Sequence, residues 1–231
     1  NAADERNFSH ALPRRLPAEV AYDALMAATY GLTRPAIEAS AEAEKMKLVN
    51  EVLPPGIYDN PLLEDAVRLG ATPELGLEEG GQVYRARHDG QPAALVFEAV
   101  APDGYSGRIQ LIVAVLADGR ISGVRVVSHK ETPGLGDYID PRKDKDRAHP
   151  WITRFDRLSL GDTGAADWKV KKDGGRFDYH VGATISARAV TNAVGRVLAY
   201  AAAHRDPLFA APNGTALPIP LPGGEGENRA H

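Results

Sequence analysis

Apolar residues follow two different periods along this chain, and the change between them divides it into elements. Residues 18–53 are rich in Ala, Leu, Met, Glu and Lys, with apolar positions at helical spacing, and they predict a helical segment. Pro35 either begins a new helix or kinks the first one. Residues 52–67 then predict a turn followed by a short helix capped by Asp59 or Asn60.

From residue 82 the apolar positions alternate, which is the pattern of half-buried strands. Two strands flank the pair Asp89-Gly90, and a similar pair of strands flanks Asp118-Gly119. An Asp-Gly pair between alternating segments is a strong hairpin signal. Residues 83–128 therefore predict an antiparallel meander of about four strands.

The C-terminal part combines loops with one helix. Residues 129–176 are loop-rich, and 168–181 predict a further hairpin that turns at 173–175. Apolar residues recur along one face of 186–205 and predict a helix; they are Val190, Val194, Val197, Leu198 and Ala201. The Pro/Gly-rich tail from Pro207 predicts extended or disordered chain. The expected fold class is α+β: an N-terminal helical segment, an antiparallel sheet and packing helices.

Charge and composition narrow the classes of function. Lys and Arg total 27 against 31 Asp and Glu, a net charge of −4, whereas a dedicated nucleic-acid binder is normally basic. The absence of cysteine excludes disulfides, thiolate metal sites, cysteine-ligated iron–sulfur clusters and cysteine nucleophiles. No intact transmembrane span is expected, because the charge-free stretch 207–224 contains five prolines and residues 18–33 contain Glu19 and Asp23.

The first candidate for chemistry is HKETPGLGDYID, residues 129–140, which follows the last predicted strand. Loops held by a rigid scaffold often carry function. Gly134 and Gly136 allow the backbone to approach another group closely, and Pro133 stiffens the entry. The glycines match neither the dinucleotide-binding nor the Walker A pattern, so a tight surface loop stays open as the alternative.

The second candidate is KKDGGRFDYHVGATIS, residues 171–186. Thr184 and Ser186 follow Gly182 and Ala183 at the start of the predicted helix, where small neighbours leave a hydroxyl accessible. One interpretation is an N-terminal cap, in which either hydroxyl accepts the free amides of the first turn. The other interpretation is a phosphate site, because those amides and the helix dipole favour an anion.

Other kinds of site find less support. Residues 140–146, DPRKDKD, carry alternating carboxylates, but a calcium loop of the EF-hand type needs Gly and Glu where Lys145 and Trp151 stand. The histidines are scattered without a zinc-protease pair, and for His129 with Glu131 a loop-stabilising role is favoured over a metal site. The sequence contains no Ser-His-Asp arrangement and no nucleophile elbow.

Three separated blocks give the chain a family resemblance. HKETPGLGDYID, WITRF and KKDGGRFDYHVGATISARAVTNAV resemble the G subunit of the Rnf/Rsx electron-transport complex, whose FMN-binding domain is shared with the C subunit of the sodium-pumping NADH:quinone reductase. Residues 33–63 also resemble the segment that follows the family's membrane anchor. The resemblance covers roughly residues 30–205. It implies an N-terminal arm with the anchor position at 1–32, an FMN-binding domain at 33–205 and a tail at 206–231.

What the resemblance implies about the site is specific. Family members carry FMN joined through its phosphate to a threonine, in a motif that runs Asp, three further positions, then Gly-Ala-Thr. In this chain the motif falls on Asp178, Gly182, Ala183 and Thr184. Thr184 is therefore the expected attachment residue and Ser186 the fallback acceptor, while Val181 replaces the more common Ser or Thr. A separate flavin transferase that uses FAD and magnesium is the implied installer.

Two further groups of residues are expected around the cofactor. The loop is expected to cover the phosphate or the isoalloxazine through backbone groups; it comprises His129, Glu131, Thr132, Pro133, Gly134, Leu135 and Gly136. Lys171, Lys172 and Arg176 are candidate charge partners for the phosphate, with a solvated hairpin as the alternative.

The resemblance implies an electron-carrying subunit of a complex that couples ferredoxin and NAD to ion translocation, with other membrane and iron–sulfur subunits as partners. The flavin domain is expected on the periplasmic side of the bacterial inner membrane, without turnover by the chain alone. Two alternatives stay open: a stand-alone flavin reductase, and a non-redox assembly module in which GATIS only caps a helix. Flavin content separates the assembly module from the others, and turnover with a soluble acceptor identifies the reductase.

Overall fold

The structure is a computed structural model whose described residues are 20, 22, 26, 40, 43–164 and 167–217. They belong to two compact units, residues 1–45 and residues 46–231. Every described residue of the first unit is helical, and so are residues 46–52 of the second. The helix predicted over 18–53 is therefore confirmed at its described positions as far as residue 52.

Most of the predicted arm and anchor position at 1–32 lies outside the described residues. Within the described ranges, no helix is both long enough and apolar enough to cross a membrane. The predicted tail is described only as far as residue 217.

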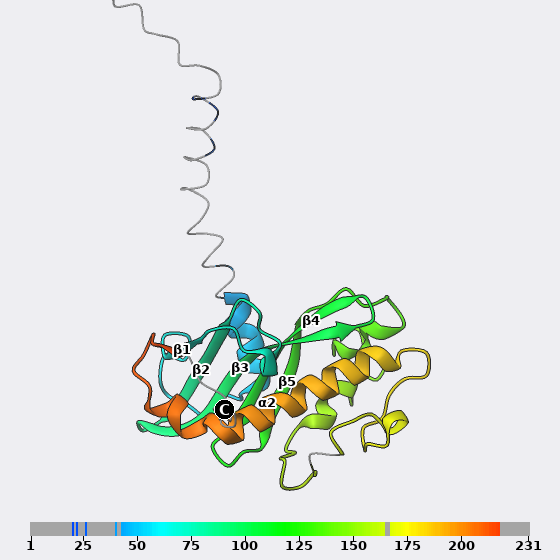
Figure 1. The fold of residues 1–231 in the computed structure, drawn as a ribbon. Helices are drawn as coiled ribbons and strands as arrows, with labels where there is room; N and C mark the ends of the chain where they lie inside the picture. Colours follow the sequence, from blue (N-terminus) through cyan, green and yellow to red (C-terminus); the bar gives the residue numbers. More distant parts are fainter. Residues whose placement is uncertain are drawn as a thin grey trace, which may run out of the picture. The chain divides into compact units, whose positions relative to one another are not determined.

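A six-stranded sheet forms the centre of the second unit (Figure 1). Its strands are β1 (Ala66–Leu69), β2 (Gly81–His88), β3 (Gln91–Gly104), β4 (Gly107–Leu116), β5 (Ile121–Ser128) and β6 (Ala216–Leu217), in the order β5-β4-β3-β2-β1-β6. Neighbouring strands are antiparallel, except that β1 and β6 are parallel. Strands β2 to β5 are the predicted meander, which is confirmed together with the α+β class.

The turn between β2 and β3 shows why the Asp-Gly signal was informative. His88 pairs with Gln91, so only Asp89 and Gly90 form the loop, with φ of 51° and 74°. A two-residue hairpin of this kind requires positive φ at both central positions, which Asp tolerates and Gly adopts without steric cost. The turn predicted at this pair is therefore confirmed.

The short helix predicted within 52–67 is wrong. That segment forms turns that lead into β1, and its polar side chains bind β2 and the β2–β3 turn. The Asp59 carboxylate accepts the N–H of Asp89 at 2.8 Å. The Asn60 side chain accepts the N–H of Arg87 at 2.8 Å and donates to the carbonyl of Arg85 at 2.9 Å. These long-range bonds occupy the two groups that the sequence suggested as helix caps.

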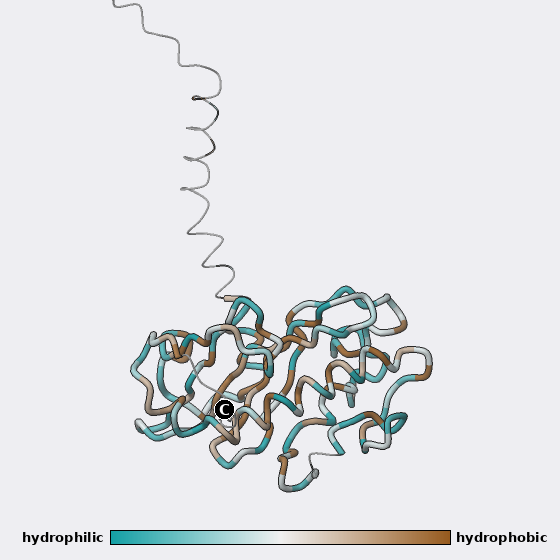
Figure 2. The backbone as a smooth tube through the Cα atoms, in the orientation of Figure 1, coloured by the Kyte–Doolittle hydropathy of each residue, from teal (hydrophilic) through white to brown (hydrophobic). Residues whose placement is uncertain are grey.

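Both faces of the sheet are covered. The helix α2 (Thr184–Ala210) runs diagonally across one face, where Leu95 and Phe97 of β3 join its apolar residues in one core (Figure 1). On the other face Ala94 and Val96 pack in a second core with residues that include Val49 of the helical segment. The middle strands are therefore apolar on both sides, as the brown segments of Figure 2 show.

The hairpin predicted at 168–181 is wrong. Only an isolated parallel bridge joins Val170 to Phe177, and a short 3₁₀ helix, η6 (Lys171–Asp173), lies between them. The chain reverses at Gly174, which has a φ of 83° and lies within 173–175, the turn that the sequence predicted. A loop closed by a single bridge replaces the expected ladder because three of its residues form the helical turn instead.

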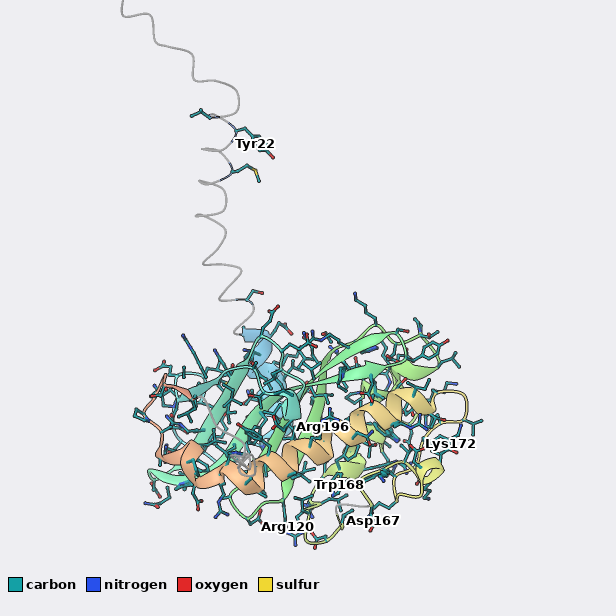
Figure 3. All side chains as sticks on the ribbon, in the orientation of Figure 1. Tyr22, Arg120, Asp167, Trp168, Lys172 and Arg196 are labelled. Carbon is teal, nitrogen blue, oxygen red and sulfur yellow. The ribbon has the colours of Figure 1, made fainter. Side chains whose placement is uncertain are left out.

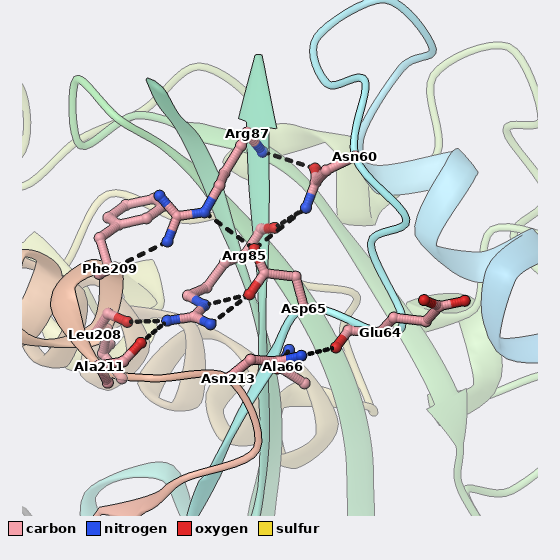
Figure 4. A network of polar contacts seen from close by, with 10 residues as sticks. All are labelled: Asn60, Glu64, Asp65, Ala66, Arg85, Arg87, Leu208, Phe209, Ala211 and Asn213. Atoms are coloured by element: carbon pink, nitrogen blue, oxygen red, sulfur yellow. Dashed lines mark hydrogen bonds and ion pairs between the residues drawn. The ribbon is translucent and has the colours of Figure 1, made fainter. Parts of the chain in front are cut away.

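The C-terminal end of α2 is held by a polar network centred on Arg85 and Asp65 (Figure 4). Arg85 donates to the carbonyls of Leu208 and Ala211, and its Nε lies 2.7 Å from Asp65 Oδ1. Arg87 donates to the carbonyl of Phe209 at 2.8 Å. These two arginines satisfy carbonyl groups that a helix end leaves without internal partners. The tail prediction is accordingly wrong at its start, because α2 continues through Pro207 to Ala210, whereas the strand β6 that follows is extended chain.

Candidate functional site

A pocket of about 260 Å³ lies at the N-terminal end of α2. Three segments that are far apart in the sequence build it: the β3–β4 turn, the loop that follows β5, and the residues that begin α2. Its lining residues are Tyr105, Glu131, Thr132, Leu135, Gly136, Gly182, Ala183, Ile185 and Ser186. We call it the α2 N-terminal pocket. The pocket thus brings together several residues expected from the loop and from the GAT motif, whereas the expected residues His129, Pro133, Gly134 and Thr184 do not line it.

The two candidate hydroxyls at this helix end differ in accessibility. Thr184, the first residue of α2, is half-buried and flanked by pocket-lining residues on both sides. Ser186 is 1% exposed, and its Oγ donates to Glu131 Oε2 at 2.5 Å. The N-cap position belongs to Ala183, with no side-chain capping bond, so the capping interpretation of Thr184 and Ser186 is wrong. The accessible hydroxyl is therefore that of Thr184.

The loop after β5 approaches α2 closely because Gly136 has no side chain. A Cβ at this position would lie 2.5 Å from Ser186 Oγ and 2.8 Å from Glu131 Oε2. Gly136 also begins a short 3₁₀ helix, η3 (Gly136–Ile139), which packs against α2. The close approach that the sequence predicted at this glycine is therefore an approach to Ser186 and Glu131.

We expect Gly136→Ala to lower the free energy of unfolding by ~1–3 kcal/mol, because the added methyl group must displace buried polar atoms. Chemical denaturation of the purified chain measures this loss. Gly161→Ala is the matched control, since its Cβ would find no atom nearer than 3.7 Å. Equal midpoints for the two variants would contradict the close packing of this loop against α2.

The segment before Thr184 is anchored to a charged cluster. Asp178 accepts from Arg154 Nη1 at 2.6 Å and pairs with Lys171 Nζ at 2.5 Å. The hydrogen bond from Lys171, the charges of both cations and the bond from Arg154 hold the pKa of Asp178 below its usual range. Trp151, which begins the 3₁₀ helix η4 (Trp151–Phe155), donates its Nε1–H to the Asp178 carbonyl at 2.7 Å.

Tyr138 fixes the same segment nearer to the helix. Its hydroxyl accepts the N–H of His180 and donates to the carbonyl of Ala183, both at 3.3 Å. The Tyr138 ring stacks on the His180 ring at a centroid distance of 3.8 Å and meets Trp151 edge-on at 5.5 Å. Burial raises the pKa of Tyr138 to about 12, so the hydroxyl keeps its proton and its role as donor at neutral pH.

The three basic residues expected near a phosphate take different places. Lys171 pairs with Asp178, and Arg176 donates to Thr163 Oγ1 at 2.8 Å. Lys172 is exposed in η6, close to the N-terminal end of α2 (Figure 3). None of the three lines the α2 N-terminal pocket.

An apolar rim surrounds this pocket, and sequence reasoning identified Leu135 but missed Tyr105 and Ile185. The side chains of Tyr105, Leu135 and Ile185 line it and remain 67%, 54% and 41% exposed. Val181, three residues before the first hydroxyl, is 93% exposed. The sequence signal for Tyr105 is an aromatic residue in the turn after β3, which does not by itself indicate a pocket.

The chain resembles known proteins over most of its length. Residues 104–199 match the FMN-binding domain family, a range that includes the pocket. The G subunit of the ion-translocating oxidoreductase complex of Pseudomonas aeruginosa is 51% identical over 173 residues, which are 75% of this chain and 78% of the relative. The proteins of the same name from Pseudoalteromonas atlantica and Vibrio cholerae are 43% and 41% identical over 189 residues, which are 82% of this chain and 86% and 88% of the relatives. These likenesses confirm the resemblance seen in the sequence, and the chain belongs to the family of G subunits of ion-translocating oxidoreductase complexes, with that family's FMN-binding domain.

Proposed function

We propose that this protein is an electron-transfer subunit of an ion-translocating oxidoreductase complex, and that it carries FMN joined through a phosphoester to Thr184. Family membership and the FMN-binding domain support the electron-transfer role. The attachment rests on one observation: Thr184 presents the accessible hydroxyl at the N-terminal end of α2, beside the α2 N-terminal pocket.

The residues present fit a flavin phosphate. The first turn of α2 has no side-chain cap at Ala183, and its amide groups and dipole favour an anion there. Gly182 has a φ of 90° and open space where a Cβ would stand, so the chain beside Thr184 stays uncrowded. The competing hydroxyl of Ser186 is buried and already bonded to Glu131.

Bound FMN supplies the redox chemistry, while the protein determines its position and potential. The loop at 129–136 and the apolar rim orient the ring system. Tyr138 and Asp178 hold the attachment segment in place through the contacts described above. Lys171 and Lys172 provide positive charge on the segment that precedes the motif, where it attracts the phosphate group over a longer range.

The same family membership supports a proposal for the partners of the protein and for its location. The partners are the other membrane and iron–sulfur subunits of an Rnf-type complex, together with a flavin transferase that installs the cofactor. The proposed location is the bacterial inner membrane, with the flavin domain facing the periplasm. The domain limits inferred from the sequence, 33–205, include the sheet apart from β6, the pocket and most of α2.

Co-expression with an active flavin transferase tests the proposal. We expect the intact mass of the chain to rise by one FMN minus one water, and the flavin absorbance to bleach under a chemical reductant. No rise in mass, with the transferase active on another target, would contradict the electron-carrier function and favour an assembly module. Steady turnover of the loaded chain with a soluble acceptor would instead favour a stand-alone reductase.

A further inference from the structure

One buried carboxylate joins the three segments of the α2 N-terminal pocket. Glu131 is 4% exposed and lines the pocket. Its Oε1 accepts the N–H of Ser106 at 3.1 Å, and its Oε2 accepts the Ser186 hydroxyl at 2.5 Å. The β3–β4 turn and the first turn of α2 therefore meet at this side chain.

Two glycines make the room that this carboxylate occupies. A Cβ at Gly104 would clash first with the Gly107 carbonyl and would lie 2.8 Å from Glu131 Oε1. A Cβ at Gly136 would lie 2.5 Å from Ser186 Oγ and 2.8 Å from Glu131 Oε2. Gly136, which begins η3, lines the pocket, and Gly104 ends β3 directly before the pocket-lining residue Tyr105. The Glu131 carboxylate is therefore closely packed between these two glycines.

The charge of Glu131 has no cationic partner in the described part of the chain. The ion pairs found there do not include it, and the donors that reach it are an amide and a hydroxyl. The ring of His129 accepts the backbone N–H of Glu131 and does not contact the carboxylate. A buried carboxylate whose partners are only dipoles keeps a negative charge at the pocket wall, and electrostatic interactions of a buried charge are stronger than in water.

We propose that Glu131 lowers the reduction potential of the flavin bound at this pocket. The inference rests on the proposed function, because it requires FMN attached at Thr184. Reduction adds negative charge to the flavin, and a nearby carboxylate without a cation disfavours that addition. Glu131 is therefore a positioning residue through its two hydrogen bonds, and its charge adjusts the potential.

Glu131→Gln removes the charge and keeps the shape. The amide oxygen can still accept the N–H of Ser106, and the amide nitrogen can donate to Ser186 Oγ once that hydroxyl rotates to act as acceptor. Ser186→Ala is the matched control, because it removes one hydrogen bond from the carboxylate and leaves the charge in place. Both variants and the wild type are co-expressed with the flavin transferase, and their loading is checked by intact mass.

The measurement is a spectroelectrochemical titration of the three loaded proteins at pH 8, with chemical denaturation of each unloaded chain beside it. We expect Glu131→Gln to shift the midpoint potential to more positive values, and Ser186→Ala to leave it unchanged or more negative. Denaturation midpoints show whether either variant has loosened the fold.

Unchanged potentials at equal loading would overturn the role of the charge and leave the proposed function standing. A positive shift of the same size in both variants would also overturn it, because loosening of the pocket would then explain the change. Absence of flavin from all three proteins would overturn the proposed function and this inference together.

Discussion

Thr184→Ala is expected to carry no covalent flavin when it is co-expressed with the transferase. The substitution removes the one accessible hydroxyl at the start of α2, and a phosphoester needs an oxygen atom on the protein. Because Thr184 is only half-buried at the first helical position, where alanine is well tolerated, the fold should be nearly unchanged. Intact mass spectrometry gives an all-or-none result.

Two variants make this test specific. Thr184→Ser keeps a hydroxyl at the same position and should restore the mass increase. Ser186→Ala should leave the increase intact, because the buried Ser186 hydroxyl is engaged with Glu131. A mass increase that persists in Thr184→Ala and disappears in Ser186→Ala would move the attachment to Ser186 and contradict the assignment.

Asp65→Asn is expected to cost about 3–5 kcal/mol of unfolding free energy, the typical result of leaving a buried charge without its partner. The side chain of Arg85 is 3% exposed and that of Asp65 is 18% exposed, so solvent cannot replace the lost carboxylate. Arg87 also loses its ion pair, since its Nε lies 3.0 Å from Asp65 Oδ2. Chemical denaturation measures the loss.

Glu78→Gln is the control for the Asp65 experiment. It breaks the pair between Glu78 and Arg108, whose side chains are 74% and 51% exposed, and exposed pairs contribute ~0–1 kcal/mol. A loss for Asp65→Asn no larger than that of the control would show that the network at the end of α2 does not stabilise the fold.

Local sequence patterns predicted those parts of the fold in which residues close in the sequence pair with one another. Strands β2 to β5 follow one another through short turns, so their alternation and Asp-Gly pairs were sufficient. β6 was not predicted, because it has only two residues and its partner strand β1 is distant in the sequence. Ala216 of β6 pairs with Arg68 of β1. No local pattern encodes such a distant pairing.

The candidate site also has parts that local sequence predicts and parts that it does not. The motif around Thr184 and the loop at 129–136 were visible as short sequence blocks. The bond that joins them, from Ser186 to Glu131, spans 55 positions and depends on the packing of α2 against the sheet. Tyr105 joins the pocket only because β3 and β4 are long enough to carry their turn to the N-terminal end of α2. Such convergence follows from topology, which periodicity alone does not determine.

The two ends of α2 have a mechanical consequence for electron delivery. Thr184 begins this helix of 27 residues, a rod of ~40 Å, and the opposite end is fastened to β2 by Arg85 and Arg87. A group attached at Thr184 is therefore fixed to a rigid helix that packs against the sheet along its length. The group cannot move far without the helix. To shorten the distance to an electron donor or acceptor, the sheet and the helix must travel together as a single body.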